Sequence, residues 1–455
     1  MMKREKRELF GSRFGVIMAL SGSAIGLGNM WRFPYLVGQN GGAAFIIIYL
    51  VLLTFICLPV LMSEVLIGRR SHRNAFRAFG KISGSNKWNF IGFLAVFAAV
   101  CVLSFYCVVG GWSVKYLIDS STLQLISNDA VYGDTFRTFI TSTHSPITYT
   151  YIFLALTGIV LLFGVSKGIE KFSKAMMVLL FILIILIAIR SVTLPGSSEG
   201  LRYLFVPDIS KVNGKVILDA LGQSFFSLSI GCGTMLTYGS YVNNDEDIVA
   251  TTSFTALFDT IFALLAGIAI IPAVFAIAQM NGSTPEINAG PGLVFITLPG
   301  VFREMPLGGL IAILFFISLL LAAITSSISL METAVAYVKE EWRRSRIVSV
   351  IIVFFICAML GSFCSLSQGV LADVHIFGSN IFDFFDKLSS NVLMAGGGLL
   401  MVLFAGWRMK KEDYLSELSN HGKNNTPKWV LKSIYLLVRY IAPIGIISIM
   451  IGNYL

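Results

Sequence analysis

The sequence predicts an all-helical integral membrane protein of eleven transmembrane helices, of which the first and the sixth are unwound near mid-membrane. Of its 455 residues, 56% are hydrophobic and only 13% are charged, a composition that excludes a soluble globular protein. Apolar runs of about twenty residues recur along the whole chain, and this is the length that crosses a bilayer as a helix. Two of these runs are interrupted by glycine-rich polar segments, at 22–34 and at 227–234.

The apolar runs predict the helices in chain order. They are expected at about 14–36, 42–67, 90–118, 148–165, 171–193, 218–241, 251–279, 305–338, 347–364, 381–407 and 429–453. The two interrupted runs are the first and the sixth, so the breaks fall at matching positions of two five-helix halves.

The basic residues predict the orientation of the chain. They gather at 3–13, 69–87, 167–174, 339–346 and 408–428. On the opposite side, Arg137 is the only Lys or Arg between 118 and 147. Because Lys and Arg favour cytoplasmic loops, the N-terminus is expected in the cytoplasm and the C-terminus outside. Topology therefore accounts for the net charge of +9, and no nucleic-acid partner is expected.

The first break reads Gly-Ser-Ala-Ile-Gly-Leu-Gly-Asn-Met-Trp-Arg-Phe-Pro over residues 22–34. Three glycines, an Asn and a Pro favour unwinding, and exposed backbone at bilayer depth persists only where protein or a cavity covers it. Arg32 adds a charge that needs a partner inside the membrane. The segment therefore predicts a binding site built from a broken helix.

The second break, Ser-Leu-Ser-Ile-Gly-Cys-Gly-Thr at 227–234, has two interpretations. Taken alone, small residues of this kind more often serve close helix packing. A pair of broken helices in matching positions is instead typical of secondary transporters, in which freed carbonyls coordinate a cation and helix ends hold a carboxylate.

Polar residues inside the other runs are further candidates. The hydroxyls of Thr325 and Ser326 form a hard-oxygen site suited to sodium with a carbonyl one turn earlier, although such hydroxyls usually bond back to their own helix. Carboxylates at bilayer depth are functional candidates by default. They are Glu64, Asp259, Glu332, Asp383 and Asp386. The six Cys and four His show neither metal-ligand spacing nor a nucleophile–base pair at depth, which argues against an enzyme.

With these residues in place, the sequence resembles the neurotransmitter:sodium symporter family, in particular its bacterial amino-acid transporters. The motifs that carry the resemblance are Gly-Asn-Met-Trp-Arg-Phe-Pro (28–34), Asn-Gly-Gly (40–42), Phe-Tyr (105–106), Gln-Ser-Phe-Phe-Ser-Leu-Ser (223–229), Thr-Tyr-Gly-Ser-Tyr (237–241) and Thr-Ser-Ser (325–327). The resemblance implies a multi-pass protein of the cell membrane with the LeuT-type fold. Its single domain, 1–455, would consist of two inverted five-helix repeats, about 8–195 and about 216–407, and an eleventh helix at about 429–453. The twelfth helix common in the family is absent, so a monomer or a weak homodimer surrounded by lipid is expected.

The resemblance also implies two sodium sites. One would use the carbonyls of Gly22, Ile25 and Ala322 with the hydroxyls of Thr325 and Ser326. The other would use the Ala24 carbonyl, the side chains of Asn29, Ser227 and Asp259, and the carboxylate of the substrate. Relatives that need chloride have a neutral residue in place of Asp259, so no chloride requirement is expected.

The implied substrate site lies between the two breaks. Its expected residues are Ala24, Gly26, Leu27, Gly28, Val102, Tyr106, Phe226, Ser229, Cys232, Ser326 and Leu330. The monoamine transporters of the family have an Asp in place of Gly26, so here the substrate must bring its own acid group. A neutral, hydrophobic or aromatic L-amino acid such as Leu, Tyr or Trp is favoured.

Two gates are implied on either side of that site. Arg32 would pair with Asp386 on the outside, and Arg7 with Glu340 on the inside, where Tyr241 supports the pair. Glu64 is expected to bond the freed backbone of the first helix. Val178 stands where the family often has a fifth-helix proline, so the fifth helix should run without a bend.

The sequence thus predicts sodium-coupled import of an amino acid by alternating access. Two alternatives stay open: the same fold carrying another small amino acid or using protons, and a sodium-dependent sensor without net transport.

Overall fold

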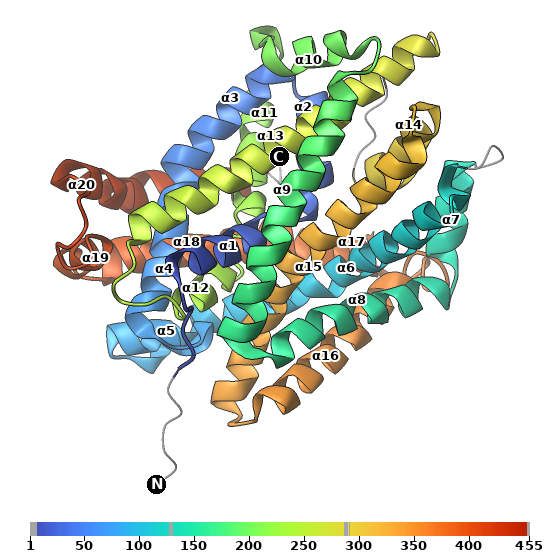
Figure 1. The fold of residues 1–455 in the computed structure, drawn as a ribbon. Coiled ribbons are helices and arrows are strands. Elements are labelled where there is room, and N and C mark those ends of the chain that lie inside the picture. Colours follow the sequence, from blue (N-terminus) through green and yellow to red (C-terminus); the bar gives the residue numbers. More distant parts are fainter. Residues whose placement is uncertain (1–6, 127–130, 286–289, 291, 453–455) are drawn as a thin grey trace.

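The computed structural model describes residues 7–126, 131–285, 290 and 292–452 of the chain, which form a bundle of helices (Figure 1). The helices of the first half are α1 (Arg13–Ala24), η1 (Gly28–Arg32), α2 (Phe33–Gln39), α3 (Ala43–Leu52), η2 (Leu53–Cys57), α4 (Leu58–Ser71), α5 (Ala75–Ser83), η3 (Asn86–Trp88), α6 (Asn89–Ser121), η4 (Gln124–Ile126), α7 (Tyr132–Thr141), α8 (Ser145–Leu162), η5 (Val165–Glu170) and α9 (Lys171–Val192).

The second half continues with the same architecture. Its elements are α10 (Ser197–Phe205), η6 (Ile209–Lys211), α11 (Gly214–Ser227), α12 (Thr234–Gly239), α13 (Ile248–Met280), η7 (Leu293–Thr297), α14 (Leu298–Glu304), α15 (Gly308–Glu341), α16 (Arg346–Leu366), β1 (His375–Ile376), β2 (Ser379–Asn380), α17 (Ile381–Lys387), η8 (Leu388–Met394), α18 (Ala395–Leu403), η9 (Phe404–Arg408), α19 (Lys411–Leu418), α20 (Lys428–Leu436), η10 (Leu437–Ile441) and α21 (Ala442–Gly452). The two strands form a short antiparallel hairpin between α16 and α17.

Within the described residues, nine helical segments are long and apolar enough to cross a membrane. A tenth is formed by α1 with the segment 28–39, two helices that meet at an angle of 58°. The sixth expected helix is divided into α11 and α12, each too short to cross a membrane alone. The breaks thus fall where the glycines predicted them, in the first and sixth segments.

Several details differ from the sequence-based expectation. The fourth helix begins three residues earlier than expected, at Ser145, and the π-helical turn η5 extends the fifth to Val165. The short helices α5, α7, α10, α14 and α19 were not expected, because none is long or apolar enough for a hydropathy signal. Residues 3–6 of the basic N-terminal segment and residue 453 lie outside the described part. Helix α9 continues without interruption past Val178, as predicted.

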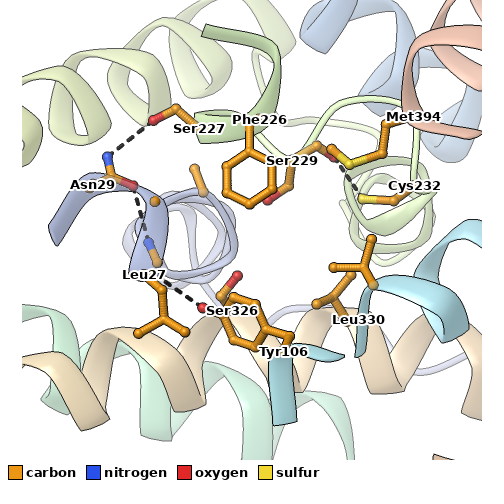
Figure 2. A pocket seen from close by; sticks show the side chains of 14 residues that line it. Leu27, Asn29, Tyr106, Phe226, Ser227, Ser229, Cys232, Ser326, Leu330 and Met394 are labelled. Carbon is orange, nitrogen blue, oxygen red and sulfur yellow. Dashed lines mark hydrogen bonds between the residues drawn. The ribbon is translucent and has the colours of Figure 1, made fainter. Parts of the chain in front are cut away.

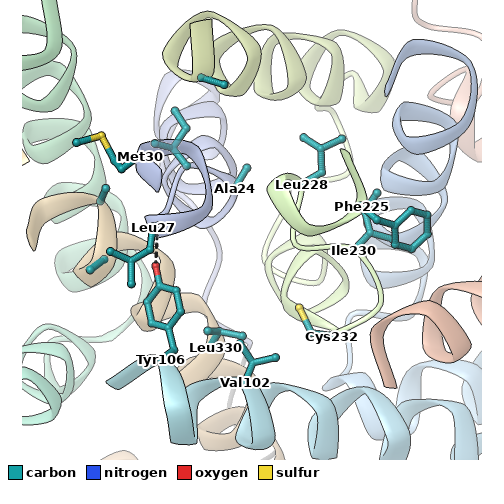
Figure 3. Packing of buried hydrophobic residues seen from close by; sticks show 14 of the residues in the cluster. Ala24, Leu27, Met30, Val102, Tyr106, Phe225, Leu228, Ile230, Cys232 and Leu330 are labelled. Carbon is teal, nitrogen blue, oxygen red and sulfur yellow. Dashed lines mark hydrogen bonds between the residues drawn. The ribbon is translucent and has the colours of Figure 1, made fainter. Parts of the chain in front are cut away.

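The broken segments lie at the centre of the bundle. Helix α1 packs against α13, α9 and α15, while α12 packs against α4 and α11 against α3. Figure 3 shows the two breaks side by side, with Leu27 and Met30 on one and Leu228 and Ile230 on the other.

Specific side chains replace the helical hydrogen bonds that the first break gives up. The last regular bond of α1 runs from the Ile25 amide to the Ser21 carbonyl, at 2.7 Å. The next two amides donate to side chains instead, Gly26 to Asn29 Oδ1 at 3.2 Å and Leu27 to the Tyr106 hydroxyl at 3.2 Å. Because these side chains satisfy the backbone, the break is stable inside an apolar bundle.

Candidate functional site

A cavity lies between the two breaks (Figure 2). It is lined by Ala24, Gly26, Leu27, Gly28, Asn29, Val102, Tyr106, Phe226, Ser227, Ser229, Cys232, Ser326, Leu330 and Met394. The fold therefore brings all eleven residues of the expected substrate site to one cavity, together with two further expected sodium ligands, Asn29 and Ser227. Met394, from the tenth segment, was not anticipated, since no sequence motif distinguishes it from other core methionines.

Glycines on the first break allow other side chains to approach its backbone. A Cβ at Gly26 would lie 2.9 Å from the Tyr106 hydroxyl, and a Cβ at Gly28 would lie 2.7 Å from the ring of Phe226. Any larger residue at either position would therefore displace one of these two rings. The glycines keep the aromatic walls of the cavity in contact with the backbone.

The second break has a left-handed backbone. Ser229, Gly231 and Gly233 have φ values of 52°, 89° and 70°. A Cβ at Gly231 would lie 2.0 Å from the Met394 carbonyl oxygen, so this turn fits against the tenth segment only as glycine. The Ser229 hydroxyl donates to the Ser23 carbonyl at 3.0 Å and joins the two breaks.

The expectation for Glu64 was wrong. Its carboxylate accepts a hydrogen bond of 2.7 Å from the Gly231 amide, in the sixth segment, and not from the first. The reason is packing, because α4 lies against α12. The second carboxylate oxygen of Glu64 is buried and has no partner among the described residues.

Asp259 forms a buried polar cluster beside the cavity. Its carboxylate accepts three hydrogen bonds. The donors are the Ser227 hydroxyl at 2.7 Å, the Asn29 amide nitrogen at 2.8 Å and the Tyr49 hydroxyl at 3.4 Å. The Asp259 side chain is fully buried, and in the described part of the chain no Lys or Arg pairs with it. A buried carboxylate with only neutral partners is costly unless a cation compensates it.

The donor chemistry of this cluster fits a hard monovalent cation. Carboxylate, hydroxyl and amide oxygens are the ligands that such ions prefer. Asn29 now presents its nitrogen to Asp259, and rotation of the amide by half a turn would present the oxygen. The sequence did not point to Tyr49, the third donor, because a tyrosine in an apolar helix carries no distinguishing signal.

The second expected ion site lies where α1 ends against α15. A Cβ at Gly22 would lie 3.3 Å from Thr325 Cβ, and the Ser326 hydroxyl donates to the Ser23 carbonyl at 3.2 Å. The Thr325 hydroxyl bonds back to Leu321 at 3.0 Å and to Ala322 at 3.1 Å. Ile25, with ψ of 111°, ends α1 in this region. The Thr325 hydroxyl thus lies within hydrogen-bond distance of the expected Ala322 carbonyl, and both hydroxyls now donate to carbonyls.

A network of charged and aromatic side chains connects the N-terminal segment with α15 and with the C-terminal end of α12. Arg7 forms an ion pair with Glu340, donates to the Ser240 hydroxyl at 2.5 Å and lies 4.8 Å from the centre of the Tyr241 ring. The Tyr241 hydroxyl continues the network by donating to Glu332 at 2.6 Å. Glu332 in turn accepts from an arginine of α16.

On another side, Arg32 and Asp386 line a second cavity, whose wall includes Phe226. The expected ion pair is not formed in this structure. The Arg32 guanidinium lies 5.0 Å from the centre of the Phe226 ring, and Asp386 accepts a hydrogen bond of 3.1 Å from the Ser390 hydroxyl.

The chain is similar to known proteins over almost its whole length. The family model described as the sodium:neurotransmitter symporter family matches residues 7–138 and 136–454. The chain is 39% identical to the uncharacterized sodium-dependent transporter YhdH of Bacillus subtilis, over 99% of this chain and 98% of the relative. It is 35% identical to an uncharacterized sodium-dependent transporter of Haemophilus influenzae, over 99% and 98%. The solved structure of MhsT in complex with L-phenylalanine superposes with a TM-score of 0.89 at 42% identity, covering 98% of this chain and 100% of MhsT.

Proposed function

The chain belongs to the sodium:neurotransmitter symporter family, and from this membership and the geometry of its cavity we propose that it imports a neutral, hydrophobic or aromatic L-amino acid together with sodium. It is a multi-pass membrane transporter with the LeuT-type fold, and its relatives are sodium-dependent transporters, not enzymes. The substrate class, the number of sodium ions, the chloride independence and the direction of transport are the parts proposed here.

The proposal rests on the lining of the central cavity, which is polar at one end and apolar at the other. Toward the first break, the Leu27 amide and the Tyr106 hydroxyl provide hydrogen-bonding groups for a carboxylate. Farther along, Val102, Leu330 and Met394 form an apolar wall. A zwitterionic amino acid with an apolar side chain has the same division into a charged end and an apolar end. The relative MhsT holds L-phenylalanine in its structure, which supports an aromatic substrate here.

The absence of an acidic side chain at Gly26 favours an amino acid over an amine. An amine without a carboxylate needs a fixed counter-charge from the protein, and Gly26 contributes none. A substrate carboxylate beside the Asp259 cluster would instead share a cation with that cluster. Because the substrate would then complete one ion site, sodium and substrate would raise each other's affinity by the same factor.

Two sodium ions are proposed, one at each oxygen cluster. The cluster around Asp259 has a fixed negative charge, so chloride is not needed to balance the ion. The cluster around Thr325 and Ser326 consists of neutral oxygens, which favour a monovalent over a divalent cation. Each charge moved across about 100 mV of membrane potential contributes about 2.3 kcal/mol to accumulation.

Alternating access would use the two groups of charged residues described above. From the positive-inside pattern we place the Arg7–Glu340 pair on the cytoplasmic side and the cavity of Arg32 and Asp386 on the outer side. Closure of the outer end would bring the Arg32 and Asp386 charges together above Phe226. Opening of the inner end would break the Arg7–Glu340 pair, which is partly exposed, with side chains 15% and 24% accessible. A hydrated pair of this kind separates at small cost.

The test is uptake of radiolabelled Phe, Leu, Tyr, Trp, Ala and Gly into proteoliposomes with an inward sodium gradient and gluconate in place of chloride. Accumulation of the large apolar amino acids, abolished when choline replaces sodium, is the expected result. Preferential uptake of Ala or Gly would contradict the substrate class. Sodium-dependent binding with no accumulation and no counterflow would identify a sensor and contradict transport.

A further inference from the structure

A second group of cations, far from the transport cavity, lies where the tenth and eleventh segments meet. Arg439, in η10, has its guanidinium 4.5 Å from the centre of the Trp407 ring, 5.5 Å from that of Tyr440 and 6.0 Å from that of Tyr435. The ammonium of Lys411, at the start of α19, lies 5.8 Å from the centre of the same Tyr435 ring. Two cations therefore share one aromatic wall.

Neither cation is neutralised by the protein. Within the part of the chain that the structure describes, no carboxylate forms an ion pair with Arg439 or Lys411. Arg439 donates one hydrogen bond, of 3.1 Å, to the Tyr435 hydroxyl, while its Nε is buried without a partner. By contrast, the arginines at 69 and 346 each pair with a buried glutamate. The positive charge of Arg439 therefore has no counter-charge among the described residues.

The position of this cluster along the bundle is that of a membrane interface. The Trp407 side chain is 58% exposed and that of Tyr440 is 46% exposed, and such amphipathic rings concentrate at headgroup level. The next residue, Arg408, donates to the carbonyl of Ser83 in α5 at 3.1 Å. Helix α5 follows Asn74, whose amide donates to Glu340, so the cluster lies at the same end of the molecule as the Arg7–Glu340 pair.

The aromatic cluster also joins two transmembrane segments. The Trp407 indole donates to the Arg439 carbonyl at 3.0 Å, and the Tyr435 hydroxyl donates to the Gly406 carbonyl at 3.0 Å. In Figure 1, α19 and α20 lie together at the edge of the bundle beside α18. A ligand held here would be accessible from the surrounding bilayer.

We propose that Arg439 and Lys411, framed by Trp407, Tyr435 and Tyr440, bind the phosphate headgroup of an anionic glycerophospholipid from the bilayer. A guanidinium donates two parallel hydrogen bonds to a phosphate, and Arg439 uses one donor within the protein, toward Tyr435, which leaves further N–H groups of the guanidinium for a phosphate. The ammonium of Lys411 adds a second charge, and basic pockets between transmembrane helices recognise anionic headgroups in this way. The exposed rings would contact the glycerol and the first part of the acyl chains.

The test is native mass spectrometry of the detergent-purified protein, mixed with equal amounts of phosphatidylglycerol and phosphatidylcholine. We expect the wild-type protein to retain phosphatidylglycerol about tenfold better, the effect expected of charge-assisted hydrogen bonds. Arg439→Gln and Lys411→Gln should each reduce that ratio severalfold. Lys215→Gln is the matched control, because it removes one exposed cation at the beginning of α11 and should leave the ratio unchanged.

Additional measurements distinguish a lipid site from the alternatives. Lys411 is exposed, so Lys411→Gln tests the site even if Arg439→Gln fails to fold. An excess of inorganic phosphate should not displace the lipid, whereas displacement would identify a free-phosphate site and overturn the proposal. Equal retention of the two lipids by the wild-type protein, or an equal loss in the Lys215→Gln control, would also overturn it. The readout is lipid retention, so it is independent of which amino acid is transported.

Discussion

Replacement of Asp259 by asparagine is the perturbation that tests the sodium chemistry most sharply. The two side chains have the same shape, and the asparagine could still accept the 2.7 Å hydrogen bond that Ser227 now donates to Asp259 Oδ2. The substitution removes the one fixed negative charge of a cluster whose other members, Asn29, Ser227 and Tyr49, are all neutral. It also removes the acceptor that the Asn29 amide nitrogen now uses at 2.8 Å.

The magnitude follows from the loss of one charge beside a monovalent cation. A pair of unit charges about 4 Å apart interacts by about 4 kcal/mol at an effective dielectric constant of about 20. The amide oxygen of the asparagine still coordinates the ion, so we take about half of this as lost. A loss of about 2 kcal/mol corresponds to a sodium affinity about 30-fold weaker.

The assay is a sodium titration of amino-acid binding and uptake, in gluconate and in chloride. In gluconate, Asp259→Asn should shift the half-maximal sodium concentration upward by about 30-fold, and chloride should restore part of the loss by supplying the missing charge. The matched control is Asp245→Asn in a loop, where the side chain is 85% exposed. A hydrogen bond from the Lys423 ammonium holds the pKa of Asp245 below its ordinary value, so the control also removes a charge.

Thermal unfolding without sodium gives a second readout. A buried carboxylate without a cation destabilises the fold, so Asp259→Asn should raise the unfolding midpoint in sodium-free buffer and reduce the further rise on adding sodium. An unchanged sodium titration in gluconate, with the protein folded, would refute the role assigned to Asp259.

The remaining predictions concern the cavity and its supports. Gly26→Ala places a Cβ 2.9 Å from a tyrosine hydroxyl and should weaken substrate binding at least about tenfold. Displacement of a labelled amino acid measures this binding, and unchanged affinity would show that the tyrosine can move aside. Cys232→Phe fills the apolar part of the cavity and should reduce uptake of Trp and Phe far more than that of Ala, as competition assays would show. Gly231→Ala combines a φ of 89° with a Cβ 2.0 Å from a backbone oxygen and should lower the thermal midpoint by several degrees, whereas Gly222→Ala, with open space around its Cβ, should not. Glu417→Gln removes the carboxylate from a buried 2.7 Å ion pair and should cost about 3–5 kcal/mol of stability, measured by thermal unfolding; a change below about 1 kcal/mol would place the pair among weak surface bridges.

The fold was predictable because its determinants are local. Apolar runs indicate bilayer-spanning helices directly, and the breaks at Gly26 and Gly231 were predictable because they fall at matching positions of the two halves. The comparisons confirm the family and the fold that the motifs indicated. The assignment of substrate and ion ligands remains a prediction, although the fold brings the expected substrate residues to one cavity.

The parts that could not be predicted depend on packing and on conformation. Glu64 was expected to bond the first break and instead bonds the second, because the packing of α4 against α12 cannot be read from the sequence. Whether Arg32 pairs with Asp386 depends on the conformational state of the transporter, and the sequence does not specify that state. Tyr49 reaches the site from an apolar helix, and Met394 from the tenth segment, where no motif distinguishes it from other core methionines.

The measurement that tests the central claim most directly is the simultaneous flux of radiolabelled sodium and a radiolabelled apolar amino acid into the same proteoliposomes. The account predicts that each flux requires the other solute, that both persist in gluconate, and that Asp259→Asn diminishes both together. Coupled symport would be contradicted if the amino acid entered at full rate without sodium, or if the sodium flux did not depend on the amino acid.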